Sequence, residues 1–124
     1  MKDCVFCKIA SGELPTELIY QSKNIVAFND INPLAPVHVI IIPRLHIKTV
    51  DDLGKKDEHL AGEMILTAQK IARELKINEK GYKLLLRVKE HGGQEIDHLH
   101  LHLIGGAKLT ENIQPIKSEA RSTK

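Results

Sequence analysis

The sequence contains no tryptophan and only four aromatic residues, two Phe and two Tyr, among 124 residues. Proteins that bind long single strands of nucleic acid stack the bases on aromatic side chains, so this scarcity argues against such a surface. The charge is nearly balanced, with 18 basic and 16 acidic residues and a net charge of +2, and this lacks the basic footprint of a nucleic-acid-binding protein. We therefore expect no nucleic-acid partner.

Long apolar segments are also missing. The longest apolar run, Val37 to Pro43, is interrupted by His38 and is far shorter than the roughly 20 residues that span a bilayer. The residues from Met1 to Cys4 begin no apolar signal region. We expect a cytoplasmic protein with no membrane partner, and the 42% hydrophobic content suits one domain with one core.

The densest functional signal is a run of three histidines that alternate with leucines, from His98 to His102. Alternation with a period of two is typical of a β-strand, so we expect the leucines to face a core and the histidines to form a row on the other face. Such a row suits proton transfer, nucleophilic attack or metal binding. Because residues four apart on a strand are about 13 Å apart, His98 and His102 cannot share one metal ion on an unbent strand.

The remaining pattern predicts an α+β domain. We expect a domain over residues 1–107 and a C-terminal tail over 108–124 that is partly disordered. The expected elements are a short helix at 5–11, paired strands at 18–20 and 25–28, a strand buried on both faces at 37–43, an amphipathic helix at 57–75, a strand at 82–88, a glycine-containing loop at 90–95 and the histidine strand at 98–104.

Four motifs, in order, make the chain resemble the nucleotide-binding branch of the histidine triad (HIT) superfamily, from about Cys4 to Gly106. They are Phe28 to His38 with its Asp-Ile and Ala-Pro pairs, Ile42-Pro43-Arg44-Leu45-His46-Ile47, Gly92-Gly93-Gln94 and His98-Leu99-His100-Leu101-His102. The resemblance implies a HIT-like fold: an antiparallel meander sheet of about five strands, one long helix and a short N-terminal helix. It also implies a homodimer, for which leftover apolar positions on the long helix are the candidates.

The resemblance implies a purine nucleotide site. His100 is the expected nucleophile, with His102 and the backbone of Gly93 to Glu95 on the phosphate and His38 as support behind the triad. His98 is the fourth expected catalytic residue, although it is unavailable as a proton donor if it binds zinc. The residues expected at the base and ribose are Phe6, Ile9, Leu14, Phe28, Asp30 and Ile31. Taken alone, Phe6 and Phe28 are equally well explained as core residues, and Asp30 as a turn residue before Asn32-Pro33.

Cys4 and Cys7 have the spacing of zinc sites and redox motifs. A redox motif needs a thioredoxin-like unit, which this fold lacks, and a structural disulfide is disfavoured in the cytosol. The resemblance implies a zinc site of Cys4, Cys7, His46 and His98, with zinc as a structural cofactor. The alternative is a pair of reduced thiols.

Two residues depart from the family pattern. Arg87 stands where many members have Asn, and it is expected either to bind phosphate bidentately or to pair outward with Glu90 or Glu95. Glu95 stands where animal members have Ser, so we expect it to contribute its backbone N–H.

The expected function is hydrolysis of nucleoside phosphoramidates, or of acyl or aminoacyl adenylates, through a covalent nucleotidyl-histidine. The alternatives are a dinucleoside polyphosphate hydrolase and a nucleotide-binding interaction module with incidental catalysis.

Overall fold

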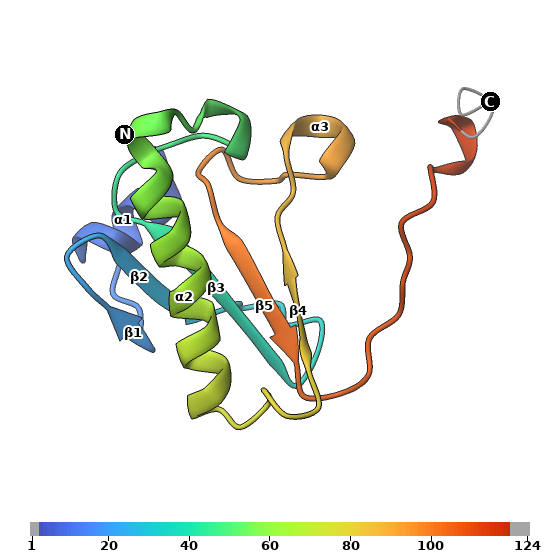
Figure 1. Ribbon diagram of the computed structural model, residues 1–124. Coiled ribbons are helices and arrows are strands. Elements are labelled where there is room, and N and C mark those ends of the chain that lie inside the picture. The colour runs from blue at the N-terminus through green and yellow to red at the C-terminus, as the bar shows by residue number, and fades with distance from the viewer. Residues whose placement is uncertain (1–2, 120–124) are drawn as a thin grey trace.

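A five-stranded antiparallel sheet with the strand order β1-β2-β3-β5-β4 forms the centre of the fold (Figure 1). The computed structural model describes residues 3–119. The strands are β1 (Tyr20–Gln21), β2 (Ile25–Asn29), β3 (Val37–Pro43), β4 (Tyr82–Leu85) and β5 (Leu101–Gly105). The helices are α1 (Val5–Ser11), α2 (Glu58–Glu74) and α3 (Lys89–Gly92). The first three strands form a meander, and β5 then returns between β3 and β4.

The two faces of β3 pack against different layers, which explains its unbroken apolar sequence. Val39 and Ile41 belong to the core under α2, together with the leucines of the histidine segment. Ile40 and Ile42 belong to a second apolar cluster on the α1 side. The expected α+β fold with a strand buried on both faces is confirmed.

The helix α1 is held at both ends by local chemistry. The Cys4 sulfur accepts a hydrogen bond from the Cys7 backbone N–H at the helix start. Gly12 ends the helix in the left-handed region, with φ of 84°, where glycine carries no Cβ penalty. Cys4 and Gly12 therefore set where this helix begins and ends.

The buried face of α2 follows the expected helical spacing. Met64, Ala68, Ile71 and Ala72 are buried against the sheet, as is Thr67. Ile65 and Leu66 remain exposed, and these are the leftover apolar positions of this helix.

Three segments differ from the sequence-based expectation. The histidine strand begins at Leu101 rather than at His98, because the Leu99 N–H donates to the Ile47 carbonyl instead of to a neighbouring strand. The strand expected over 82–88 ends at Leu85. The expected glycine loop starts with the single turn α3, which Gly93 ends at a φ of 79°.

The chain leaves the sheet after β5 as an extended segment, described up to Glu119 (Figure 1). The expected tail over 108–124 lies partly outside the described residues. In the described part of the chain, the helices fall short of the length and apolar content that crossing a membrane requires.

Candidate active site and metal site

The three histidines of the triad lie on the α1 side of the sheet, but they belong to two different groups. His102 lies in β5 opposite Ile40 of β3, and the His100 and His102 ring centres are 4.9 Å apart. His98 precedes the strand and turns its Nδ1 toward Cys4 and Cys7. All three side chains are buried. His98 therefore belongs with the cysteines, whereas His100 and His102 lie together.

The protonation pattern of His100 follows from one backbone contact. Its Nδ1 lies 2.7 Å from the His98 carbonyl oxygen, which can only accept, so Nδ1 carries the proton and Nε2 keeps its lone pair. Burial lowers the pKa of His100, with the Arg87 charge acting in the same direction. The ring of Phe6 packs edge-on against it at 5.1 Å. His100 is therefore a neutral imidazole with a fixed tautomer.

A second backbone contact orients His38 and, through it, His102. The Leu34 N–H donates to His38 Nδ1 at 3.1 Å, so the proton of His38 lies on Nε2. That Nε2 is 2.9 Å from His102 Nδ1 and 3.4 Å from an Asp30 carboxylate oxygen. His38 therefore donates to His102. Because this proton lies between the two rings, His38 and His102 form a hydrogen-bonded pair with the Asp30 carboxylate beside it, rather than a three-ligand metal site with Asp30.

Arg87 faces the same group. Its Nη1 is 3.3 Å from His102 Nε2, and among residues 3–119 no ion pair joins it to Glu90 or Glu95. Burial, then the neighbouring His100, Arg87 and His38, lower the pKa of His102 to about 4. The inward of the two orientations expected for Arg87 is the one observed.

The loop from Gly93 to Glu95 is largely satisfied by its own hydrogen bonds. The backbone N–H groups of Gly93 and Gln94 donate to carbonyls of Glu90 and Lys89. The Gln94 amide donates to the carbonyls of Lys48 and Ile96, and Glu95 is exposed. In this structure Gln94 therefore ties the loop to its surroundings.

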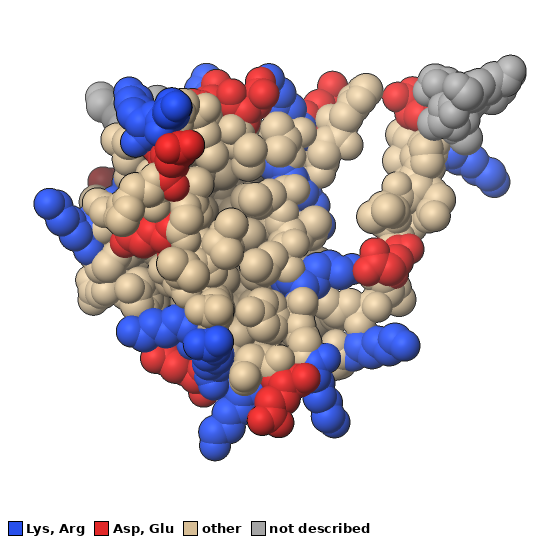
Figure 2. Space-filling model, in the orientation of Figure 1, with Lys and Arg blue, Asp and Glu red and all other residues tan. Residues whose placement is uncertain are grey.

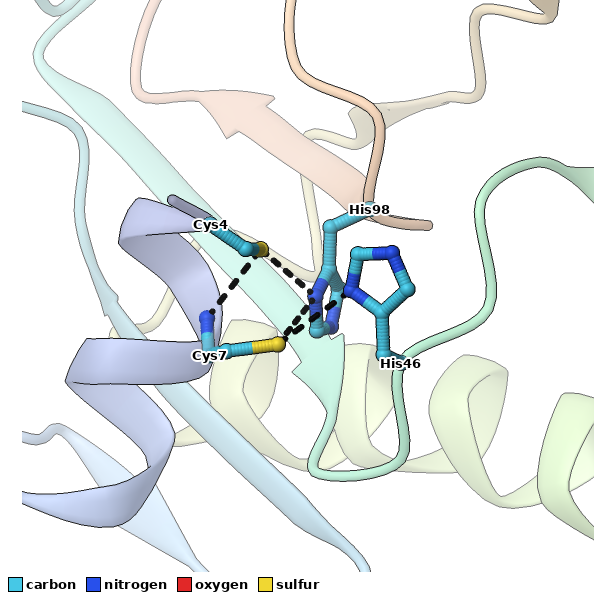
Figure 3. A group of neighbouring side chains, drawn as sticks. All are labelled: Cys4, Cys7, His46 and His98. Carbon is cyan, nitrogen blue, oxygen red and sulfur yellow. Dashed lines mark hydrogen bonds between the residues drawn. The ribbon is translucent and has the colours of Figure 1, made fainter. Parts of the chain in front are cut away.

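The four residues expected at the metal site come together from three parts of the chain (Figure 3). Cys4 and Cys7 lie at the start of α1, His46 follows β3, and His98 precedes β5. Their ligand atoms all lie within 4.8 Å of one another. His98 Nδ1 is 3.2 Å from Cys4 Sγ and 3.5 Å from Cys7 Sγ, and His46 Nδ1 is 3.2 Å from Cys7 Sγ.

This geometry and chemistry fit zinc. Bonds of about 2.3 Å to sulfur and 2.0–2.1 Å to nitrogen would place tetrahedral S and N ligands roughly 3.5 Å apart. His98 Nε2 donates to the Pro43 carbonyl at 2.9 Å, so its Nδ1 lone pair faces the sulfurs. Burial and the adjacent Cys4 raise the pKa of the Cys7 thiol, and a bound cation would offset this effect. A cleft lined by Cys4, His46 and three carboxylates, Asp3, Glu95 and Asp97, leads to the group.

The residues expected at the base and ribose do not all lie together. Phe6, Ile9 and Phe28 are buried in the α1-side cluster, with the two Phe rings 5.5 Å apart. Ile31 is 91% exposed, and Leu14 is also exposed. Asp30 serves both interpretations, because one carboxylate oxygen accepts from the Asn32 N–H in a turn while the other lies near His38.

The sequence does not identify the three groups that orient the histidines. They are the Leu34 N–H and the carbonyls of Pro43 and His98. All are backbone atoms, so side-chain identity gives no signal for them.

Comparison with known proteins identifies the family. A family model described as "Scavenger mRNA decapping enzyme C-term binding" matches residues 3–114. A HIT-like protein of Buchnera aphidicola is 46% identical over 107 residues, which is 86% of this chain and 96% of that protein. The chain belongs to the histidine triad family.

Two further members of the HIT family bear on function and fold. The purine nucleoside phosphoramidase of Escherichia coli is 44% identical over 108 residues, 87% of this chain and 91% of that enzyme. The crystal structure of a HIT family hydrolase from Legionella pneumophila superposes with a TM-score of 0.87 at 44% identity, covering 90% of this chain and 99% of that one. The expected HIT-like fold is thus confirmed.

Proposed function

We propose that this protein is a purine nucleotide hydrolase that cleaves nucleoside phosphoramidates, or acyl or aminoacyl adenylates, with His100 as nucleophile. The observation that carries the proposal is the 2.7 Å contact between His100 Nδ1 and the His98 carbonyl, which leaves Nε2 unprotonated. A neutral imidazole nitrogen with a fixed lone pair suits attack on an α-phosphorus. The likeness to a purine nucleoside phosphoramidase supports the substrate class.

The reaction proceeds in two displacements. His100 Nε2 attacks phosphorus, the P–N or P–O bond to the leaving group breaks, the leaving amine takes a proton from solvent, and a nucleotidyl-histidine forms. Water then attacks the same phosphorus, gives up a proton to solvent, and releases the nucleoside monophosphate and the neutral imidazole. Phe6, Ile9 and Phe28 are proposed for the base and Asp30 and Ile31 for the ribose, while His102 and the loop from Gly93 to Glu95 are proposed for the phosphate oxygens. Because the Gly93 and Gln94 N–H groups already donate to carbonyls, the Glu95 N–H is the donor that this loop offers.

We also propose that the group of Cys4, Cys7, His46 and His98 holds one zinc ion. With four protein ligands the site is closed, so zinc supplies cross-linking of the chain rather than chemistry. His98 is then occupied at both ring nitrogens and donates no proton to the leaving group.

The oligomeric state that we propose is a homodimer, through an apolar patch of Ile65, Leu84 and Leu86. Glu63 bonds Ser22 and Asn24, and Lys70 lies over Tyr20, so this flank of α2 faces β1 and the Ile65 flank faces β4. Figure 2 shows few charges in the middle of this face and more around its rim. Exposed apolar patches of this kind mark interaction sites.

Covalent capture tests the proposal. Wild-type protein quenched during turnover of adenosine 5′-phosphoramidate should carry an added AMP mass on His100. His100→Ala should retain AMP binding and lose turnover by more than about 10⁴-fold, as loss of a covalent nucleophile does. His59→Gln, at an exposed histidine of α2, is the control and should behave as wild type.

Other outcomes select the alternatives. An adduct on another histidine, or activity without His100, refutes the nucleophile. Cleavage of a dinucleoside polyphosphate but of no phosphoramidate or adenylate favours the polyphosphate hydrolase. AMP binding without any turnover by wild type favours the interaction module.

A further inference from the structure

The contact between Arg87 and His102 brings two hydrogen-bond donors together. His38 holds its proton on Nε2 because its Nδ1 accepts from the Leu34 N–H. Only one proton fits between His38 Nε2 and His102 Nδ1 at 2.9 Å, so His102 Nδ1 is the acceptor and its own proton lies on Nε2. That Nε2–H is the atom that faces Arg87 Nη1 at 3.3 Å.

A guanidinium nitrogen can only donate, so these two groups do not hydrogen-bond to each other. Half-buried donors that face each other lack acceptors, and this costs free energy unless a third group accepts from both. One oxyanion oxygen placed between them would accept a charge-assisted hydrogen bond from each. The geometry is therefore that of an anion site.

The glycine loop passes beside Arg87. A Cβ added at Gly93 would lie 3.5 Å from Arg87 Cδ, and one at Gly92 would lie 3.5 Å from the Arg87 carbonyl carbon, so the glycines keep this space free of side chains. Gly93 also adopts a φ of 79°, which side chains disfavour. The Gly-Gly pair thus leaves the space beside the Arg87 side chain open.

We propose that Arg87 and the Nε2–H of His102 bind one non-bridging phosphate oxygen together, and that Arg87 is a catalytic residue. As His100 Nε2 attacks, negative charge grows on the non-bridging oxygens. A fixed guanidinium therefore stabilises the transition state more than it stabilises the ground state. The catalytic part rests on the proposed function, whereas the anion site does not.

Two ligands separate the anion site from a general effect on folding. Arg87→Gln should weaken AMP binding by about tenfold, the value of a lost charged hydrogen bond, and leave the affinity for adenosine, which lacks phosphate, unchanged. The kcat for adenosine 5′-phosphoramidate should fall by about 10²-fold or more, as on removal of one donor from an oxyanion site. Arg87→Lys keeps the charge and should recover part of the kcat.

Lys83→Gln is the matched control. It removes one positive charge from β4, where Lys83 bonds the Thr110 carbonyl and Glu111 rather than a histidine. Its AMP affinity and kcat should equal those of wild type. An equal loss in both variants would mean that net charge, rather than the Arg87 contact, sets binding, and would overturn the proposal.

Long-range ¹H–¹⁵N spectra of the histidine rings check the hydrogen positions directly. His102 should carry its proton on Nε2, and this signal should shift on addition of AMP but not of adenosine. A proton on Nδ1, or an Arg87→Gln protein with unchanged AMP affinity, or equal losses for AMP and adenosine, would each overturn the proposal. If the wild type shows no turnover but Arg87→Gln still loses AMP binding selectively, the anion site is retained and only the proposed function is rejected.

Discussion

At the scale of single residues, hydrogen direction decides the chemistry. Three of the four buried imidazoles have one nitrogen fixed by a backbone group, either an N–H that must donate or a carbonyl that must accept. His38, His98 and His100 therefore hold defined tautomers, and His102 follows from His38. Burial also lowers the pKa of His38, so the whole group is neutral near pH 7.

This neutrality predicts a pH-dependent stability. The pKa of His102 is about 4 in the folded protein and 6.5 in the unfolded chain. Between pH 6.5 and pH 4, the proton therefore binds the unfolded chain but not the folded protein. Stability therefore falls as the pH falls from 6.5 toward 4, and His102 should contribute about 2 kcal/mol of loss between pH 7.5 and 5. Denaturant unfolding at the two pH values measures this loss.

Comparison of variants isolates this contribution from that of the metal ligands. His102→Gln should lose about 2 kcal/mol less than wild type over the same pH interval, whereas His59→Gln should match wild type. Identical pH slopes for all three proteins would contradict the assignment.

At the scale of elements, α1 joins the two sites. Cys4 and Cys7 bring its start to His46 and His98, and Phe6, between the two cysteines, packs on the rings of His98 and His100. The His98 carbonyl in turn holds His100. A seven-residue helix has little stability of its own, so these contacts keep it in place.

Loss of the metal should therefore lower stability. Cys7→Ser, or chelation of the wild type, should lower the melting temperature by roughly 10 °C, the shift expected when a ligand held well above its dissociation constant is lost. Elemental analysis of protein purified without an affinity tag should give about one zinc per chain.

Val5→Ser provides the matched control on the same helix, since Val5 is partly exposed and is not a ligand. It should retain zinc and nearly the wild-type melting temperature. Wild-type protein with far less than one zinc per chain and freely reactive thiols would reject the metal site.

At the scale of the whole molecule, the sheet has two unlike edges. One edge is β1, which lies beside α2 through the Lys70 and Tyr20 contact. The other edge is β4, where Leu84 lies opposite the buried Leu103 but remains exposed itself. The apolar patch of Ile65, Leu84 and Leu86 lies toward this second edge, which favours association there.

A charge in this patch should separate the subunits. Ile65 is 50% exposed, so Ile65→Glu should fold normally while burying a charge in the proposed dimer interface. Light scattering should show a dimer for wild type and a monomer for the variant at micromolar concentration. Thr16→Glu adds the same charge at an exposed polar position and should remain dimeric; a wild type that is monomeric throughout contradicts the proposal.

The sequence by itself determined what local periodicity and motif spacing encode. The long helix, the doubly buried strand and the leucine face of the histidine segment follow from apolar spacing, and four ordered motifs indicated the HIT fold and the members of both residue groups. These features depend on side-chain identity, which a sequence states directly.

Only the tertiary structure decided where the histidine strand begins, which way Arg87 points and which ring nitrogen carries each proton. The Ile47 carbonyl that receives Leu99 is 52 residues away in the chain, and the Leu34, Pro43 and His98 groups that orient the imidazoles are backbone atoms. Every residue carries such atoms, so no choice of amino acid marks them. Their roles arise from long-range packing, which brings a donor or acceptor to within 3.1 Å of one ring nitrogen and not the other.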